Sequence, residues 1–259
     1  MSPAHDPFAS TETYYADYRP GYGDSAVAYL ATRFALDDAS RVLDLGCGAG
    51  QITVPLAAHA GRVVGMDPNE KMLHEAKARA TRTGRTNIEW VVGSDAELDS
   101  LDGRFALTTM GRSFHWMAQE ETLERLHAMI EPGSGLAIVG DDEWFTRGTK
   151  DWQDAVYELA AEYLELPERT GPIEYDDPWD ELVGEFCFSD VETVTFAFER
   201  EWTVEEIVGY VFSLSYCSPA TFGTDRAAFE SELRDLFDPD ETVTQDAVTT
   251  VIAGRKPGY

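Results

Sequence analysis

Residues 41–56 read Arg-Val-Leu-Asp-Leu-Gly-Cys-Gly-Ala-Gly-Gln-Ile-Thr-Val-Pro-Leu. The first five residues form a mainly apolar run of strand length. Three glycines follow at alternate positions, and a helical pattern then begins with Pro55 near its first turn. Glycine has no Cβ, so the backbone can double back and a ligand can lie against main-chain N–H groups. The stretch therefore predicts a strand, a glycine turn and a helix that hold a ligand.

The spacing of the glycines indicates which ligand this turn holds. A dinucleotide-binding turn has the pattern G-x-G-x-x-G, and Gln51 stands where its third glycine would fall. The observed Asp-x-Gly-x-Gly-x-Gly resembles motif I of the class I S-adenosylmethionine-dependent methyltransferases. The resemblance implies that these residues bind the cofactor S-adenosylmethionine: Asp44, Gly46, Cys47, Gly48 and Gly50.

Length and charge limit the possible architectures and partners. The chain has 259 residues, of which 43% are hydrophobic, so we expect one globular domain over 1–259 rather than two independent domains. Acidic residues number 48 against 20 basic ones, which gives a net charge of −28. This charge repels both a nucleic-acid backbone and an anionic membrane surface. The composition therefore favours a small-molecule partner, with no nucleic acid and no membrane.

The basic residues are mostly arginine, since four are lysine: Lys71, Lys77, Lys150 and Lys256. An acidic chain poor in lysine resembles proteins of salt-loving organisms, where strong screening removes the self-repulsion of the charge. The alternative is an acidic protein from a GC-rich genome. The sequence predicts adaptation to high salt.

Cysteine usage and the start of the chain bear on the compartment. The three cysteines, Cys47, Cys187 and Cys217, form no C-x-x-C pair, and no two histidines lie at metal-ligand spacing with a carboxylate. We therefore expect a reducing compartment and no metal. Residues 1–6 lack the basic and apolar regions of a signal peptide, and the uncharged run 207–224 contains glycine, proline and hydroxyls. These features predict a cytoplasmic protein.

A second short strand, residues 62–66, ends at Asp67 and Pro68. Nucleotide-binding sheets place a carboxylate on the ribose hydroxyls about 20 residues after the glycines, and Asp67 has this position. The alternative is a turn-forming aspartate before proline. The following residues resemble the family's Asp-x-Ser-x-x-Met segment, which implies that Pro68 contacts the cofactor and that Met72 packs on the adenine ring. Asn69 is expected to cap the next helix.

A third strand is expected over residues 87–92, followed by Asp95 and Ala96. The resemblance implies that Asp95 accepts the adenine amino group and that the Ala96 amide reaches a ring nitrogen. The alternative, compatible with the first, is that Asp95 caps a helix.

The segment after the fourth strand, 105–110, contains the candidate catalytic residues. It resembles the Ala-x-His-Trp-Phe element of the trans-aconitate-methyltransferase-like group, with Ser113 and Met117 as the departures. A lone histidine is more often structural, but this one leaves the sheet at the carboxyl edge where ligands bind. We predict His115 as a general base and Trp116 as a wall of the acceptor pocket. A carboxylate acceptor would need no base, and Arg112 or Arg147 would then hold it. Arg112 is therefore a catalytic candidate, and it is also assigned to the cofactor.

Residues 1–24 are predicted to form a lid, because the stretch 8–23 is dense in tyrosine around one arginine. The segment resembles the Tyr-x-x-x-Arg-Pro-x-Tyr entry of small-molecule methyltransferases, which closes over the cofactor. We assign Tyr14 and Arg19 to the cofactor and Tyr18 to the acceptor pocket. The alternative is an arm packed on the surface of the domain.

Residues 141–188 interrupt the strand–helix alternation with an aromatic segment that contains Trp144 and Arg147. An insertion at this point lies over the carboxyl edge of the sheet and is a natural cap over the acceptor. Trp144 and Arg147 are therefore assigned to the acceptor pocket. The alternative is an ordinary helical cap whose aromatic residues form its own core.

The remaining pattern completes an α/β fold. Strand and helix periods alternate up to Gly140, which predicts a parallel sheet covered on both faces. Residues 191–200 and 243–255 read as two late strands, resembling the antiparallel hairpin that ends the class I sheet. We expect a Rossmann-like, doubly wound, mostly parallel seven-stranded sheet with a helical cap insertion.

The sequence as a whole predicts a methyltransferase that uses S-adenosylmethionine, releases S-adenosylhomocysteine and methylates an oxygen, nitrogen or carbon of a small molecule. One alternative is an NAD(P)-dependent oxidoreductase, which the glycine spacing and the lack of a Tyr-x-x-x-Lys pair disfavour. Another is a non-catalytic module that binds the cofactor or its product. A monomer and a homodimer both remain open.

Overall fold

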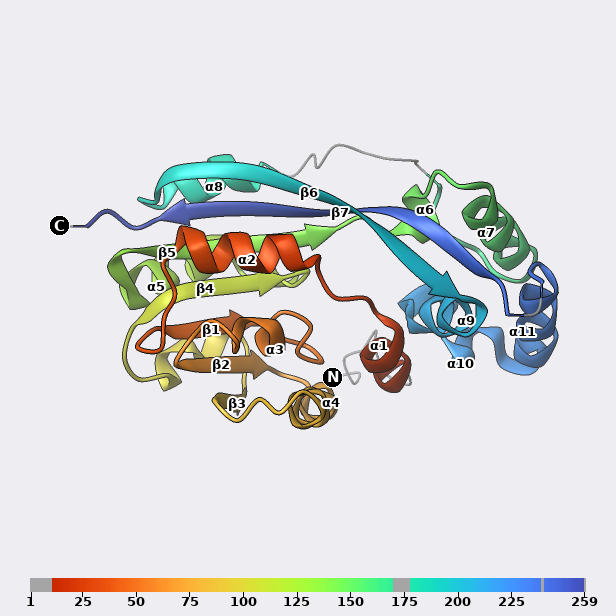
Figure 1. The fold of residues 1–259 in the computed structure, drawn as a ribbon, viewed down its shortest axis with the longest axis horizontal. Helices are drawn as coiled ribbons and strands as arrows, with labels where there is room; N and C mark the ends of the chain where they lie inside the picture. Colours follow the sequence, from red (N-terminus) through yellow and green to blue (C-terminus); the bar gives the residue numbers. More distant parts are fainter. Residues whose placement is uncertain (1–10, 170–177, 239, 259) are drawn as a thin grey trace, which may run out of the picture. The chain divides into compact units, whose positions relative to one another are not determined.

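Seven strands form one sheet in the order β3-β2-β1-β4-β5-β7-β6 (Figure 1). This computed structural model describes residues 11–169, 178–238 and 240–258. The strands are β1 (Arg41–Leu45), β2 (Arg62–Asp67), β3 (Ile88–Val92), β4 (Phe105–Gly111), β5 (Ile130–Asp141), β6 (Ser189–Thr203) and β7 (Thr242–Arg255). β1 pairs in parallel with β2 and β4, β2 with β3, and β4 with β5, whereas β7 runs antiparallel to β5. The predicted fold class is confirmed.

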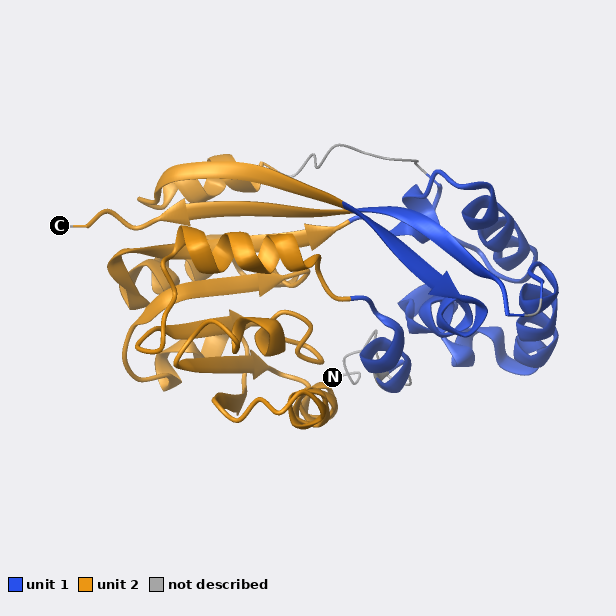
Figure 2. Cartoon of the chain, in the orientation of Figure 1, with its two compact units in different colours: residues 1–20, 142–175, 198–247 blue, residues 21–141, 176–197, 248–259 orange. Residues whose placement is uncertain are grey.

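The chain divides into two compact units, coloured separately in Figure 2. The sheet unit comprises residues 21–141, 176–197 and 248–259, and the cap unit comprises residues 1–20, 142–175 and 198–247. The expected cap, 141–188, is therefore shared between the units, and the expected lid, 1–24, falls mostly in the cap unit. Residues 1–10 and 170–177 of these two predictions lie outside the described part of the chain.

Two apolar clusters pack the sheet unit. In β1, Val42 belongs to one cluster, while Leu43 and Leu45 belong to the other, because alternate side chains of a strand face opposite sides. The first cluster includes residues of α2 (Asp24–Arg33) and α3 (Thr53–Leu56), and the second includes residues of α5 (Gln119–Met129) and α8 (Trp179–Glu185). Helix α4 (Glu70–Arg82) contacts β2 and β3. The sheet is thus packed on both faces, as expected.

Trp179 is one aromatic of the expected cap that the structure places elsewhere. It starts α8, is 6% exposed and packs edge-on against Phe114, with ring centroids 5.4 Å apart. Its helix supplies Val183 to the same sheet cluster. After the cap, the chain therefore re-enters the sheet unit before β6 begins.

The cap unit has an aromatic core. Its helices are α1 (Glu12–Tyr18), α6 (Trp144–Arg147), α7 (Asp151–Tyr163), α9 (Val204–Ser213), α10 (Pro219–Phe222) and α11 (Arg226–Asp235). Thr203 and Glu206 form a capping box at the start of α9. Every residue of α9 from Ile207 to Ser213 is buried, which explains the uncharged run in the sequence. Among the described residues, no helix is long and apolar enough to cross a membrane.

Candidate active site

The glycine turn after β1 has the left-handed backbone that its sequence predicts. The φ angles of Gly46, Gly48 and Gly50 are 70°, 52° and 79°. The N–H groups of Gly46 and Cys47 both donate to the Met66 carbonyl, at 2.8 and 3.0 Å, which ties the turn to the end of β2. Residues with a Cβ adopt such angles at a cost, so glycine is the residue that this turn requires.

Asp67 joins the ends of β1 and β2. Its Oδ2 accepts a hydrogen bond from the Gly48 N–H at 2.8 Å, and its Oδ1 accepts one from the Asn69 N–H at 2.9 Å. Burial raises the pKa of this carboxyl, although the two hydrogen bonds oppose the shift. Asn69 caps α4 as predicted, accepting from Lys71 and Met72. The carboxylate that we assign to the ribose thus also shapes the turn.

Asp44 lies beneath the turn and has no exposed surface. Its two oxygens accept hydrogen bonds from the hydroxyls of Thr53 at 2.5 Å and Thr109 at 2.9 Å. Burial raises the pKa of Asp44 to about 7, against the opposing effect of the two hydroxyls. Burial also raises the pKa of the Cys47 thiol, so this cysteine stays protonated at neutral pH. Sequence reasoning missed Thr53 and Thr109, because neither belongs to the glycine pattern.

The segment after β4 lies directly against the glycine turn. A Cβ on Gly46 would come within 2.5 Å of the Ser113 Cβ, and the Ser113 hydroxyl donates to the Leu45 carbonyl at 2.8 Å. A short 3₁₀ helix, η2 (Phe114–Trp116), follows. The structure therefore brings η2 to the glycine turn, as the parallel pairing of β1 and β4 requires.

His115 and Trp116 are exposed residues of η2, while Phe114 is buried in the sheet core. Their rings are 5.0 Å apart and inclined by 47°. Trp116 is 66% exposed, which makes it one of the few large exposed apolar side chains described. An accessible imidazole and an exposed indole are suited to meet an acceptor molecule.

Arg112 is held by contacts within the sheet unit. Its Nη1 lies 3.1 Å from both carboxylate oxygens of Asp141, and its guanidinium lies 5.0 Å from the ring centroid of Tyr22. Its φ is 51°, and its N–H donates to the Val139 carbonyl at 2.9 Å. Gly111 accommodates Tyr22, since a Cβ there would lie 2.6 Å from the phenol oxygen. Arg112 is thus positioned by Asp141 and Tyr22, neither of which sequence reasoning assigned to the site.

Asp95 contacts the start of α5. Its Oδ2 accepts hydrogen bonds from the Ala118 N–H at 3.0 Å and the Thr122 hydroxyl at 3.2 Å. Arg125 donates to the Ala96 carbonyl at 2.9 Å. The capping alternative for Asp95 is wrong, because Ser94 caps the 3₁₀ helix that starts at Asp95 and accepts from the Ala96 N–H at 3.2 Å. Asp95 instead contacts the start of a helix more than 20 residues further along the chain. Its assignment to adenine stays a prediction, as does that of Met72, which is 5% exposed.

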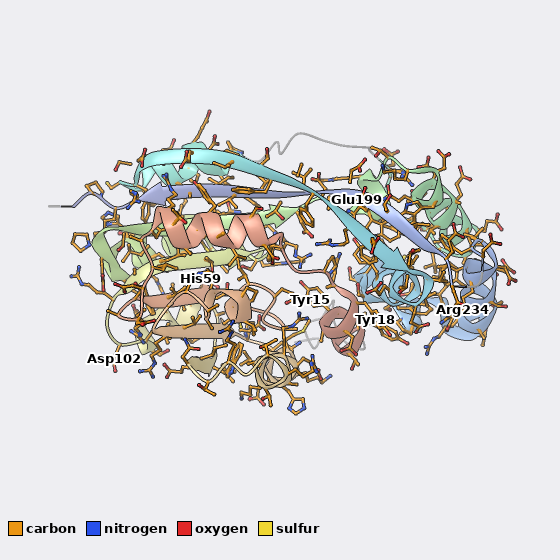
Figure 3. All side chains as sticks on the ribbon, in the orientation of Figure 1. Tyr15, Tyr18, His59, Asp102, Glu199 and Arg234 are labelled. Carbon is orange, nitrogen blue, oxygen red and sulfur yellow. The ribbon has the colours of Figure 1, made fainter. Side chains whose placement is uncertain are left out.

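The other candidates belong to the cap unit. The Tyr14 phenol oxygen accepts a hydrogen bond from Arg226 at 2.8 Å, and Arg19 donates to the Tyr210 phenol oxygen at 3.1 Å. Tyr18, labelled in Figure 3, covers Gly209 so closely that a Cβ there would lie 2.2 Å from its ring. These contacts attach α1 and the residue after it to α9 and α11 within one unit.

Trp144 is an element of the cap unit's core. It is 2% exposed, and its ring centroid is 4.8 Å from that of Tyr210 and 4.7 Å from that of Trp152. Arg147, on the same short helix, is half-buried and forms no ion pair within the described ranges. The core role considered for the cap aromatics therefore applies to Trp144.

Gln51 is another residue that sequence reasoning noted only for its place in the glycine pattern. It is 6% exposed, and its amide nitrogen is buried without a hydrogen-bond partner among the described residues. In the same part of the chain, no three His, Cys, Asp or Glu side chains are grouped to hold a metal ion.

Residues 42–133 match the family model described as a methyltransferase domain. An uncharacterised methyltransferase-like protein of Schizosaccharomyces pombe is 27% identical over 206 residues, which span 78% of this chain and 75% of that protein. The family-model match over residues 42–133 includes the glycine turn, Asp67, Asp95 and His115.

Two solved structures show the same fold. A candidate type II methyltransferase from Anaeromyxobacter dehalogenans aligns with a TM-score of 0.63 and 23% identity, over 93% of this chain and 99% of that one. Haemonchus contortus phosphoethanolamine N-methyltransferase 2, solved with phosphomonomethylethanolamine and S-adenosylhomocysteine, aligns with a TM-score of 0.53 and 17% identity. That alignment covers 96% of this chain and 57% of the other.

Proposed function

We propose that this chain is a class I S-adenosylmethionine-dependent methyltransferase, an inference supported by its match to a methyltransferase domain over residues 42–133 and by the order of its sheet. We propose that it binds S-adenosylmethionine and methylates a small molecule. The net charge of −28 supports a small acceptor over a nucleic acid.

The residues of the sheet unit fit the cofactor. The three glycines of the turn have left-handed backbones, and the buried Gln51 amide is a donor for which the described residues supply no acceptor. With the strand order β3-β2-β1-β4, the parts of the cofactor would lie in sequence along the carboxyl edge of the sheet. Asp95, Ala96 and Met72 would hold adenine, Asp67 and Pro68 the ribose, and the glycine turn with Asp44 and Cys47 the amino-acid arm.

The acceptor would meet the end of β4. When bound, S-adenosylmethionine supplies an electrophilic methyl group that a nucleophile can attack in line. An acceptor that carries a proton needs a base, and the exposed His115 next to the glycine turn is the group that we assign to this role. Trp116 would cover one side of the acceptor. Arg112, already paired with Asp141, would orient an anionic acceptor at this strand end.

The cap unit supplies the remaining candidates. Tyr14 and Arg19 stay assigned to the cofactor and Tyr18, Trp144 and Arg147 to the acceptor. Arg147 is the strongest of these candidates for an anionic acceptor, because it forms no ion pair within the described ranges of a strongly acidic chain.

The observation that carries the proposal is the hydrogen bond between Asp67 and Gly48, which fixes a carboxylate beside a left-handed glycine turn. The test is a turnover assay that detects S-adenosylhomocysteine while small carboxylic acids, phenols, alcohols and amines are offered as acceptors. We expect turnover with one class, reduced by His115→Ala without loss of cofactor binding. Cofactor binding with no turnover on any class would support the non-catalytic module instead.

A further inference from the structure

Gln51 follows the last glycine of the turn and carries a buried amide whose donor is unused. The side-chain nitrogen has no hydrogen-bond partner among the described residues, although the residue is 6% exposed. A buried N–H group that has lost water without gaining an acceptor destabilises a fold. Such a group calls for an acceptor that the described residues do not supply.

Two other buried glutamines form hydrogen bonds through their side chains. Gln153 is 1% exposed, and its side-chain oxygen accepts from the N–H groups of Thr149 and Lys150 at 2.8 and 3.0 Å. Gln245 is 3% exposed, and its oxygen accepts from the Trp202 indole at 2.9 Å. Among the buried glutamines of the described residues, Gln51 is the one whose side-chain nitrogen is both shielded from solvent and without a partner.

The strand order indicates which part of the cofactor lies near Gln51. If adenine lies at β3 and ribose at β2, the next strand along the sheet is β1, and the glycine turn follows β1. The amino-acid arm of the cofactor would therefore lie at this turn. That arm carries an ammonium group, which donates, and a carboxylate, which accepts.

We propose that the Gln51 side-chain nitrogen donates a hydrogen bond to the α-carboxylate of S-adenosylmethionine. This assignment rests on the proposed function and adds a residue that distinguishes the full cofactor from a nucleoside without the amino-acid arm. The donor is buried before the ligand arrives, so binding satisfies a group that is costly in the ligand-free protein.

The test compares two ligands on the full-length protein. S-Adenosylhomocysteine carries the amino-acid arm, whereas 5′-methylthioadenosine lacks it. Gln51→Met keeps the length of the side chain and removes its donor. We expect the dissociation constant for S-adenosylhomocysteine to rise roughly ten- to hundredfold, as for loss of a hydrogen bond to a charged group, with that for methylthioadenosine unchanged within about twofold.

Ligand-free stability gives a second readout. Gln51→Met should unfold at the wild-type temperature or above it, because it removes an unsatisfied group. The matched control, Gln245→Met, should unfold at a lower temperature, because Trp202 loses its acceptor.

Three outcomes overturn the assignment: unchanged binding of S-adenosylhomocysteine, equal weakening of both ligands, or a loss of stability in Gln51→Met as large as that in Gln245→Met. In each of these cases the proposed function still holds as long as the wild-type protein binds S-adenosylhomocysteine. If the wild-type protein itself does not bind S-adenosylhomocysteine, the proposed function fails and this assignment fails with it.

Discussion

Asp67 accepts the N–H of Gly48 at 2.8 Å, so the carboxylate at the end of β2 holds the turn that follows β1. Asp67→Ala removes this acceptor together with the one used by Asn69. We expect the affinity for S-adenosylhomocysteine to fall by roughly a hundredfold or more, since both turn geometry and a charged hydrogen bond are lost. Titration calorimetry measures the change.

The control for this variant is Asp99→Ala, which removes an exposed carboxylate from the 3₁₀ helix η1 (Asp95–Ser100). It should bind S-adenosylhomocysteine like the wild type. Wild-type affinity in Asp67→Ala would show that this carboxylate does not contribute to the site.

Asp44 makes folding stability depend on pH. Its pKa is about 7 in the folded chain because of burial, above the value near 3.9 of an unfolded chain. Between about pH 4 and 7 the unfolded state therefore loses this proton first, so the group's contribution to stability falls as pH rises and then levels off. Urea unfolding at several pH values should show that the free energy of unfolding falls less steeply with rising pH in Asp44→Asn than in the wild type. Burial shifts the Asp67 pKa in the same direction, so some decline persists in the variant. Identical pH profiles would contradict a raised Asp44 pKa.

Gly46 allows the segment after β4 to approach the turn. Gly46→Ala should lower the free energy of unfolding by roughly 1–2 kcal/mol for the left-handed residue and by about 1–3 kcal/mol more for the clash with Ser113. Gly133→Ala is the matched control, because its φ is 82° but a Cβ there would meet no atom within 4 Å. Equal losses in the two variants, measured in urea, would show that the clash is absent.

The ion pair between Arg112 and Asp141 should contribute more to stability than an exposed pair. The side chains of Arg112 and Asp141 are 17% and 12% exposed, against 58% and 40% for Arg62 and Glu89. Asp141→Asn should lower the free energy of unfolding by roughly 2–4 kcal/mol, and Glu89→Gln by about 1 kcal/mol or less. Equal changes in the two variants would mean that Arg112 is not anchored by Asp141.

Salt should stabilise a chain with a net charge of −28. Raising KCl from about 0.1 M to about 1 M shortens the screening length from about 10 Å to about 3 Å, so repulsion among the carboxylates falls and the unfolding temperature rises. The control is a triple variant that neutralises three exposed carboxylates, none of which forms an ion pair among the described residues: Asp38→Asn, Glu124→Gln and Glu158→Gln. Its unfolding temperature should rise less with added KCl than that of the wild type. A flat salt response would contradict adaptation to high salt.

The sequence predicted the sheet because its signals are local. The apolar runs, the glycine turn and the capping residue Asn69 each act within a few residues, and the structure confirms them. Trp179 shows the limit of this reasoning. Its aromatic neighbours in sequence suggested that it belongs to a cap. Its contact with Phe114 depends instead on the path of the chain after the cap, and the hydrophobic periodicity of a short segment does not predict that path.

The candidate site was likewise predicted only in part. The glycines and Asp67 follow a fixed spacing and could be found from it. The pairing of Arg112 with Asp141 joins residues 29 positions apart, and the hydrogen bond from Ala118 at the start of α5 to Asp95 spans 23 positions. The unsatisfied amide of Gln51 is a property of its surroundings in the fold. Such relationships arise from tertiary packing and are therefore invisible in the pattern of residues.

The central claim is that the glycine turn and Asp67 hold S-adenosylmethionine. The most direct measurement is calorimetric titration of the purified full-length chain with S-adenosylhomocysteine and, separately, with NADH, at low and high KCl. We predict micromolar binding of S-adenosylhomocysteine, lost in Asp67→Ala, and no binding of NADH. Binding of NADH with no binding of S-adenosylhomocysteine would contradict the account and support an oxidoreductase.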